Sequence, residues 1–204
     1  MTASQAQVKA LQSRWQLIAI GTSLGGMQAL NTVLSVLPAD FGIPIAVVQH
    51  RYRHSGELLP AIFGKNARLR VCDAEDRMPV IPGRVYIAPA DYHLLVERGQ
   101  FHVSVEPPVA YSRPSIDVLF ESAADAYGDG GIAVVLTGSN SDGAHGVVRV
   151  KQRGGFVVVQ DPATAEAPEM PRAAMDTGRA DRVLPLDRIG TYLIDLCRTT
   201  AACP

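Results

Sequence analysis

The chain has 204 residues, a formal net charge of −1 and 47% hydrophobic residues, which suits one domain with a substantial core. Acidic and basic residues nearly balance, so the composition gives no bias toward nucleic acid. No apolar run approaches the ~20 residues of a membrane span, and the N-terminus lacks an apolar signal core. We therefore expect a cytoplasmic protein that neither binds nucleic acid nor inserts into a membrane.

The first part of the chain alternates buried strands with helices. Residues 17–20 form an apolar run that predicts a strand, and residues 27–37 carry apolar side chains at helical spacing until Pro38 ends the pattern. Further elements are expected as a strand at 43–48, a short helix at 55–63 and a strand at 69–72. Buried strands separated by helices indicate a parallel, doubly wound sheet.

The middle of the chain has a different pattern, and the alternation of strands and helices then returns. Short segments at 85–88, 93–96 and 101–105, joined by tight turns, predict an antiparallel excursion with a hairpin loop at 97–100. Later elements are expected as helices at 115–127, 143–153, 171–176 and 186–198, and as strands at 132–137, 156–160 and 183–184. The expected fold is a three-layer, doubly wound α/β domain over residues 17–204. It has a mainly parallel sheet with that hairpin excursion, and residues 1–16 are a polar lead-in.

A glycine-rich turn after the first strand holds the first candidate for chemistry. Ser23 lies in the sequence Gly-Thr-Ser-Leu-Gly-Gly at 21–26, between the carboxyl end of a strand and the start of a helix. Reactive groups of open α/β sheets lie at that position, and helix-start amides can stabilise an oxyanion. The same turn also matches the G-x-S-x-G elbow of α/β-hydrolases and resembles a degenerate phosphate-binding loop.

Two further strand ends carry polar side chains. His50 follows the second strand, and Asp142 lies in the loop after the strand at 132–137. Alone, His50 could simply begin a loop and Asp142 could be a helix cap. Parallel strands bring their carboxyl ends to one edge, however, so Ser23, His50 and Asp142 are expected to meet as nucleophile, base and orienting carboxylate.

The order of these residues weakens both competing interpretations. An α/β-hydrolase runs Ser, then Asp or Glu, then His, whereas this chain runs Ser23, His50, Asp142. A dinucleotide site would have an acidic residue after the second strand, where this chain has Gln49 and His50. The three cysteines have neither an even count nor metal-ligand spacing, so we expect free thiols, no metal and no cofactor.

Several motifs together resemble one family. They are the strand and turn at 17–26, Val-Gln-His at 48–50, Arg-Pro-Ser-Ile-Asp at 113–117, Leu-Thr-Gly at 136–138, Asp-Gly-Ala at 142–144, Gly-Gly at 154–155, Gln-Asp at 160–161 and Met-Pro-Arg at 170–172. The chain from about Leu17 to about Arg198 is similar to the catalytic domain of the CheB-type protein-glutamate methylesterases of bacterial chemotaxis.

The resemblance implies a cofactor-free serine hydrolase. Such enzymes remove methyl groups from glutamate γ-methyl esters on the cytoplasmic domain of chemoreceptors, releasing methanol, and many deamidate receptor glutamines. The family's nucleophile, base and carboxylate match Ser23, His50 and Asp142. We expect the amides near Leu24 and Gly25 to hold the oxyanion. The full set of oxyanion and loop-support candidates is Thr22, Leu24, Gly25, Gly26, Thr137, Gly138 and Ser139.

The chain also departs from the family pattern. Arg51-Tyr52 replaces the usual Met-Pro after the histidine, Ser139-Asn140 replaces Met-Gly, and Glu169 replaces a glycine. These loops shape the substrate groove, and Arg51, Tyr52 and Arg53 are candidate contacts with an acidic receptor surface; a solvated loop is the plain alternative. The altered loops also keep open a non-catalytic scaffold role in a chemosensory complex. Family members usually carry an N-terminal receiver domain, which we do not expect here, so the chain is expected to be constitutively active.

Overall fold

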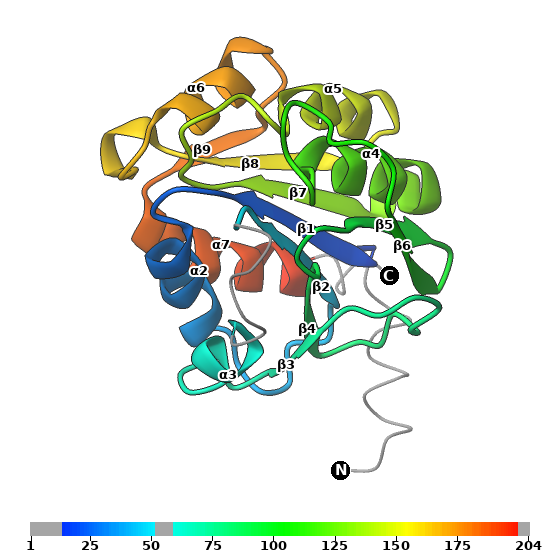
Figure 1. The fold of residues 1–204 in the computed structure, drawn as a ribbon. Helices are drawn as coiled ribbons and strands as arrows, with labels where there is room; N and C mark the ends of the chain where they lie inside the picture. The colour runs from blue at the N-terminus through cyan, green and yellow to red at the C-terminus, as the bar shows by residue number, and fades with distance from the viewer. Residues whose placement is uncertain (1–13, 52–58, 200–204) are drawn as a thin grey trace.

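A seven-stranded parallel sheet forms the centre of the molecule, in the order β3-β4-β2-β1-β7-β8-β9. The computed structural model describes residues 14–51 and 59–199. Figure 1 shows the sheet between two layers of helices. The strands are β1 (Leu17–Thr22), β2 (Ile45–Gln49), β3 (Arg70–Asp73), β4 (Arg84–Ile87), β7 (Gly131–Val135), β8 (Phe156–Gln160) and β9 (Arg182–Leu184). The three-layer α/β fold predicted from the sequence is confirmed.

The helices divide between the two faces of this sheet (Figure 1). One face is covered by α2 (Gly26–Ser35), α3 (Leu59–Phe63) and α7 (Leu186–Thr199). The other carries α4 (Ile116–Tyr127), α5 (Ala144–Gln152) and α6 (Glu169–Asp176), together with the antiparallel pair β5 (His93–Glu97) and β6 (Gln100–Ser104). Two 3₁₀ turns, Gly128–Gly130 and Pro162–Thr164, lie in the connections.

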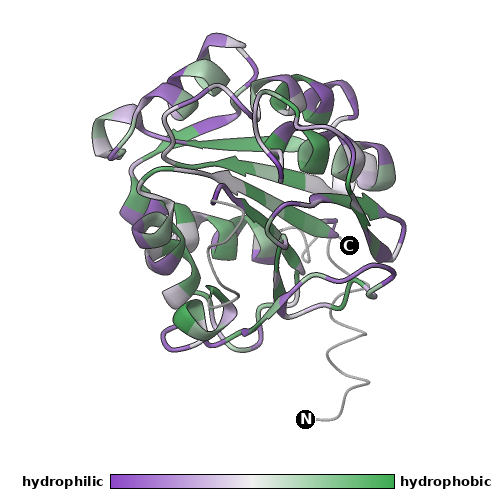
Figure 2. Cartoon of the chain, in the orientation of Figure 1, coloured by the Kyte–Doolittle hydropathy of each residue, from purple (hydrophilic) through white to green (hydrophobic). Residues whose placement is uncertain are grey.

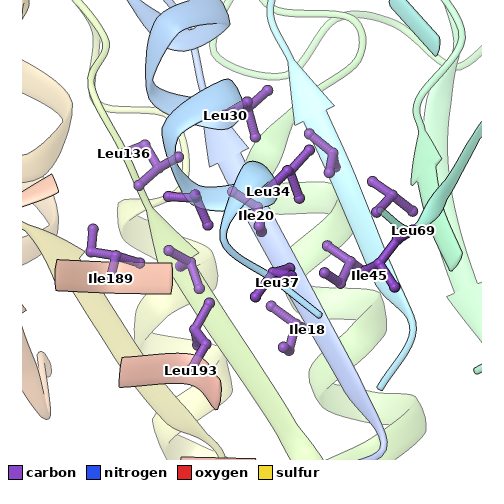
Figure 3. Packing of buried hydrophobic residues seen from close by; sticks show 14 of the residues in the cluster. Ile18, Ile20, Leu30, Leu34, Leu37, Ile45, Leu69, Leu136, Ile189 and Leu193 are labelled. Carbon is purple, nitrogen blue, oxygen red and sulfur yellow. The ribbon is translucent and has the colours of Figure 1, made fainter. Parts of the chain in front are cut away.

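Alternation along each strand builds two hydrophobic cores. On β1, Ile18 and Ile20 face α2 and α7, whereas Leu17 and Ala19 face α4. Figure 3 shows the first core, where Leu30 and other residues of α2 meet β1. Because both faces of the sheet are covered, its central strands are mostly apolar, as Figure 2 shows.

One part of the predicted topology is wrong. The segment at 85–88 was expected in the antiparallel excursion, but β4 lies in the main sheet, parallel to both β3 and β2. Val85, Tyr86 and Ile87 are completely buried between the two layers, which explains their continuous apolar run. The hairpin β5–β6 is a separate two-stranded sheet. The first half of the helix expected at 55–63 lies outside the described residues.

The core begins just before the first strand. Trp15 is buried, its ring meets Phe156 edge-on at 5.8 Å, and its indole N–H donates to Leu196 O at 3.2 Å. The last residues of the expected polar lead-in therefore help to close the core against α7. None of the described helices has both the length and the apolar content of a membrane span.

Candidate active site

The sheet reverses its strand order beside β1, and the candidate residues gather there. The chain runs outward from β1 through β2 to β3 and β4, and then returns to place β7 on the other side of β1. Ser23 follows β1, His50 follows β2, and Asp142 lies in the loop after β7. A crevice outside the carboxyl ends of strands at such a switch point is where open α/β sheets bind ligands.

Ser23 lies in a tight turn between β1 and α2. Its backbone N–H donates to Thr137 O at 2.9 Å, and its carbonyl accepts from Gly26 N at 2.9 Å. Gly25 caps the helix with a left-handed φ of 78°, and a Cβ there would lie 2.7 Å from Glu166 Cβ. Glycine is therefore needed at position 25 for both its backbone angle and its close approach to Glu166.

Two backbone amides beside Ser23 are suited to an oxyanion. The amides of Ser23 and Gly26 are already used, whereas those of Leu24 and Gly25 have no acceptor within the described part of the chain. Both directly precede α2, whose positive dipole end favours negative charge. Their position agrees with the oxyanion role expected from the sequence, which stays a prediction.

His50 is oriented by a carboxylate. Its Nε2 lies 2.8 Å from Asp142 Oδ2, and the Asp142 side chain is completely buried. A neutral imidazole that donates from Nε2 to the carboxylate keeps its lone pair on Nδ1. Nδ1 is then the ring nitrogen that can act as a base, and its action on Ser23 stays a prediction.

The start of α4 holds Asp142 in its ionised form. Oδ1 accepts from Ser115 Oγ at 2.9 Å and from Asp117 N at 3.0 Å, and Oδ2 accepts from Ile116 N at 2.8 Å. Burial alone would raise the pKa of Asp142, but the hydrogen bonds from His50 and from the α4 amides outweigh it and lower the pKa. The site therefore contains a carboxylate that stays charged although it is buried.

Thr137 connects three loops at this edge. Its N–H donates to Gln160 Oε1 at 2.9 Å, and its hydroxyl donates to Leu24 O at 2.9 Å while accepting from Ala167 N at 2.9 Å. Thr22 Oγ1 in turn donates to Thr137 O at 2.8 Å. Thr22 and Thr137 thus lie where the sequence predicted loop support.

Two more loop candidates lie in the same connection, Gly138 and Ser139. Gly138 exchanges hydrogen bonds with the α6 segment through Ala167 O and Met170 N. A Cβ at position 138 would lie 2.5 Å from Met170 Cε and 3.0 Å from Ser23 Cβ, so a side chain there would press on the serine. Ser139 is exposed and lines the cavity.

Gln49 is a site residue that sequence reasoning did not identify. Its buried Nε2 donates to Ser23 O at 2.8 Å and to His50 O at 2.9 Å, which joins the serine turn to the histidine loop. A Cβ on Gly26 would lie 2.1 Å from Gln49 Oε1, so the glutamine needs this glycine. The signal in the sequence is an amide that ends an otherwise apolar strand.

The candidate substrate contacts are only partly placed. Arg51 lines the cavity, but its side chain is 8% exposed and its guanidinium donates to Ala88 O at 3.0 Å, with Asp73 at 4.0 Å. This corrects the expectation of an exposed charge at position 51, because the side chain turns back onto the neighbouring strand ends. Tyr52 and Arg53 lie outside the described residues.

An open cavity of about 860 Å³ lies over these residues. Ser23 and His50 line it together with the first turn of α2, residues 108 and 111–114 of the loop before α4, and Glu166. Within the described ranges, no group of three or more His, Cys, Asp or Glu side chains is arranged to hold a metal ion. Besides His50, the described residues that line the cavity include the charged side chains of Arg51, Asp91, Arg113 and Glu166.

Known proteins share this sequence and fold. The family model described as CheB methylesterase matches residues 18–193. A relative from Leptospira interrogans, provisionally named a protein-glutamate methylesterase/protein-glutamine glutaminase, is 46% identical over 89% of this chain and 95% of its own length. The protein-glutamate methylesterase FrzG of Myxococcus xanthus is 41% identical over 90% of this chain, which spans 56% of that protein.

A solved structure agrees with these matches. The CheB methylesterase catalytic domain of Thermotoga maritima superposes with a TM-score of 0.86 and 36% identity, covering 89% of this chain and 98% of that one. The family match covers most of the chain, including the positions of Ser23, His50 and Asp142. The chain belongs to the CheB methylesterase family.

Proposed function

We propose that this chain is a serine hydrolase that removes methyl groups from glutamate γ-methyl esters of a chemoreceptor or related signalling protein. The observation that carries the proposal is the hydrogen bond between His50 and the buried, ionised Asp142. It lies at the same edge of the sheet as Ser23, which is in the turn between β1 and α2. The names of the relatives support the substrate class: the Leptospira and Myxococcus proteins are both named protein-glutamate methylesterases.

The chemistry follows from the positions of these groups. Nδ1 of His50 takes the Ser23 proton as Oγ attacks the γ-carbonyl carbon, and the amides of Leu24 and Gly25 stabilise the resulting oxyanion. The tetrahedral intermediate then breaks its bond to the methoxy oxygen, which takes the proton from His50 and leaves as methanol. Water attacks the acyl-enzyme with His50 again as base, and this releases the glutamate and restores Ser23.

Asp142 acts throughout this cycle without changing its own protonation. It holds His50 in the tautomer that leaves Nδ1 basic, and its charge stabilises the imidazolium that forms in each half-reaction. The α4 amides keep the carboxylate charged, so it cannot take the histidine proton. In this scheme His50 alone takes up and gives back the proton, and Asp142 only orients it.

Deamidation of a receptor glutamine uses the same groups, and the Leptospira relative's name includes that activity. The amide nitrogen replaces the methoxy oxygen and leaves as ammonia after it takes the His50 proton. Without protonation the nitrogen would have to leave as an amide anion, a poorer leaving group than methoxide, so this reaction depends more strongly on His50 as acid. We expect ester hydrolysis to be the faster of the two.

Methanol release from a methylated chemoreceptor domain tests the proposal. Ser23→Ala removes the nucleophile and is expected to lower the rate by about 10⁴-fold or more. Ser35→Ala, at the opposite end of the same helix, is the matched control and should leave the rate unchanged. Equal rates for the native protein and Ser23→Ala would contradict the assignment. Ammonia release exceeding methanol release, from a substrate offering both groups, would reverse the ranking of the two reactions.

A further inference from the structure

A tight turn in the loop between β6 and α4 has an unusual backbone. Val109 N donates to Ser112 O at 3.1 Å and Ser112 N donates back to Val109 O at 2.8 Å, so Ala110 and Tyr111 form a two-residue turn. Both have left-handed backbone angles, with φ of 47° and 63°. Glycine and asparagine favour such turns, whereas residues with larger side chains rarely adopt them.

The base of this turn is firmly held. Arg113 Nε and Nη2 donate to Asp91 Oδ1 at 3.0 and 2.7 Å, and Nη1 donates to the carbonyls of Val105 and Glu106 at 2.8 and 3.0 Å. The Arg113 side chain is only 13% exposed. These bonds fix both ends of the loop, so the turn projects from a rigid support.

Tyr111 is wholly exposed at the tip of this turn, yet it lines the same cavity as Ser23. A fully exposed ring contributes nothing to the core, so its left-handed backbone is not explained by packing. Tyrosine is suited to contact with another protein, because its large rigid ring loses little conformational entropy on binding. The backbone geometry and the exposure of Tyr111 therefore favour a role for its ring in contact with another protein.

Two further apolar side chains line the same cavity. They are Leu24 and Met27, at the start of α2, which are 54% and 36% exposed. A glutamyl side chain is short, with about 4 Å between its Cα and its γ-carbonyl carbon. When that carbon reaches Ser23, the backbone of the substrate must lie close to the cavity rim.

The parts of the protein substrate that flank the methylated glutamate would then meet the rim, where Tyr111 and Met27 are exposed. We propose that Tyr111 is a recognition residue for the protein substrate and contacts side chains that flank the methylated glutamate, with Met27 as a second contact. This inference rests on the proposed function, because it takes a glutamyl methyl ester on a protein as the substrate.

The test uses substitutions at position 111 and two substrates, a methylated chemoreceptor domain and p-nitrophenyl acetate. Tyr111→Asn removes the ring but suits the left-handed backbone, so the melting temperature is expected to stay level or rise by about 1–3 °C. For the receptor substrate, kcat/KM should fall roughly tenfold, mainly through KM, whereas hydrolysis of the small ester should be unchanged. Tyr111→Phe keeps the ring and should retain receptor activity.

Val105→Ala is the matched control, since Val105 is an exposed apolar residue of the same loop that does not line the cavity. It should leave both activities unchanged. Equal receptor activity in Tyr111→Asn and native protein would overturn the inference and leave the proposed function standing. Parallel losses on both substrates would also overturn it, since the turn would then support the triad. Native protein that hydrolyses the small ester but releases no methanol from the receptor would overturn the proposed function and this inference with it.

Discussion

The two sides of the active-site edge differ in burial and in polarity. On the α4 side, the buried Asp142 carboxylate accepts hydrogen bonds from Ser115, Ile116, Asp117 and His50. On the rim, Tyr111 is wholly exposed and Leu24 and Met27 are partly exposed. The buried side fixes the charge and geometry that acyl transfer needs, and the rim offers apolar surface to whatever carries the ester. Changes to the buried side should therefore affect every substrate, whereas changes to the rim should affect only large ones.

Of the three substitutions that compare the two sides, Asp142→Asn should give the largest loss, and it tests whether the buried side is catalytic. An asparagine whose NH₂ group faces His50 cannot accept the Nε2 proton, so the histidine moves its proton to Nδ1 and loses the lone pair that Ser23 needs. We expect kcat to fall by about 10³–10⁴-fold with p-nitrophenyl acetate and with methylated receptor alike. A loss below tenfold on either substrate would show that the carboxylate does not orient the base.

Gln49→Met should have an intermediate effect. The substitution keeps the length of the side chain but removes the amide that bonds both Ser23 O and His50 O, so the two loops can separate slightly. Small displacements of catalytic groups are costly, and we expect kcat to fall about 10- to 100-fold on both substrates. Gln152→Met, exposed at the end of α5, serves as the control. A fall in kcat on the receptor substrate alone would show that Gln49 acts in substrate recognition, as proposed for the rim, and not in holding the catalytic groups.

Asp117→Asn should have the smallest effect of the three, and we expect it to change the free energy of unfolding rather than catalysis. Burial raises the pKa of Asp117 to about 6, although its Oδ1 accepts from Gly146 N at 2.7 Å. The folded protein therefore binds more protons than the unfolded chain between about pH 4 and 6, so the free energy of unfolding falls as the pH rises through that window. An asparagine can keep the bond to Gly146 without the charge, and should add about 1–2 kcal/mol of stability at pH 7 but none at pH 4.

Urea unfolding across pH 4–7 measures that difference. Asp125→Asn on the same helix should behave oppositely, because hydrogen bonds from Arg149 and Arg153 lower the pKa of this exposed carboxyl. Its loss should slightly destabilise the protein at pH 7, and less so in high salt. Equal responses of the two variants at pH 7 would show that burial does not govern Asp117.

The sequence predicts those features that local pattern determines. The strand before Ser23 is a continuous apolar run, and the positions of Ser23, His50 and Asp142 at strand ends follow from the parallel sheet. Which strands pair is not a local property, so the apolar run at 85–88 gave a strand but not its parallel place between β3 and β2. Gln49 and Arg51 were likewise missed or misplaced, because their bonds reach the serine turn and Ala88, which are distant in the sequence.

The central claim is that Ser23 is a nucleophile activated by His50, and covalent labelling tests it most directly. The protein is treated with a fluorophosphonate, and the adduct is measured by intact mass and located by peptide mapping. We expect a single adduct on Ser23 in the native protein, none in Ser23→Ala, and labelling slowed by several orders of magnitude in His50→Ala. An adduct on another residue, or equal labelling of folded native and His50→Ala protein, would contradict the account.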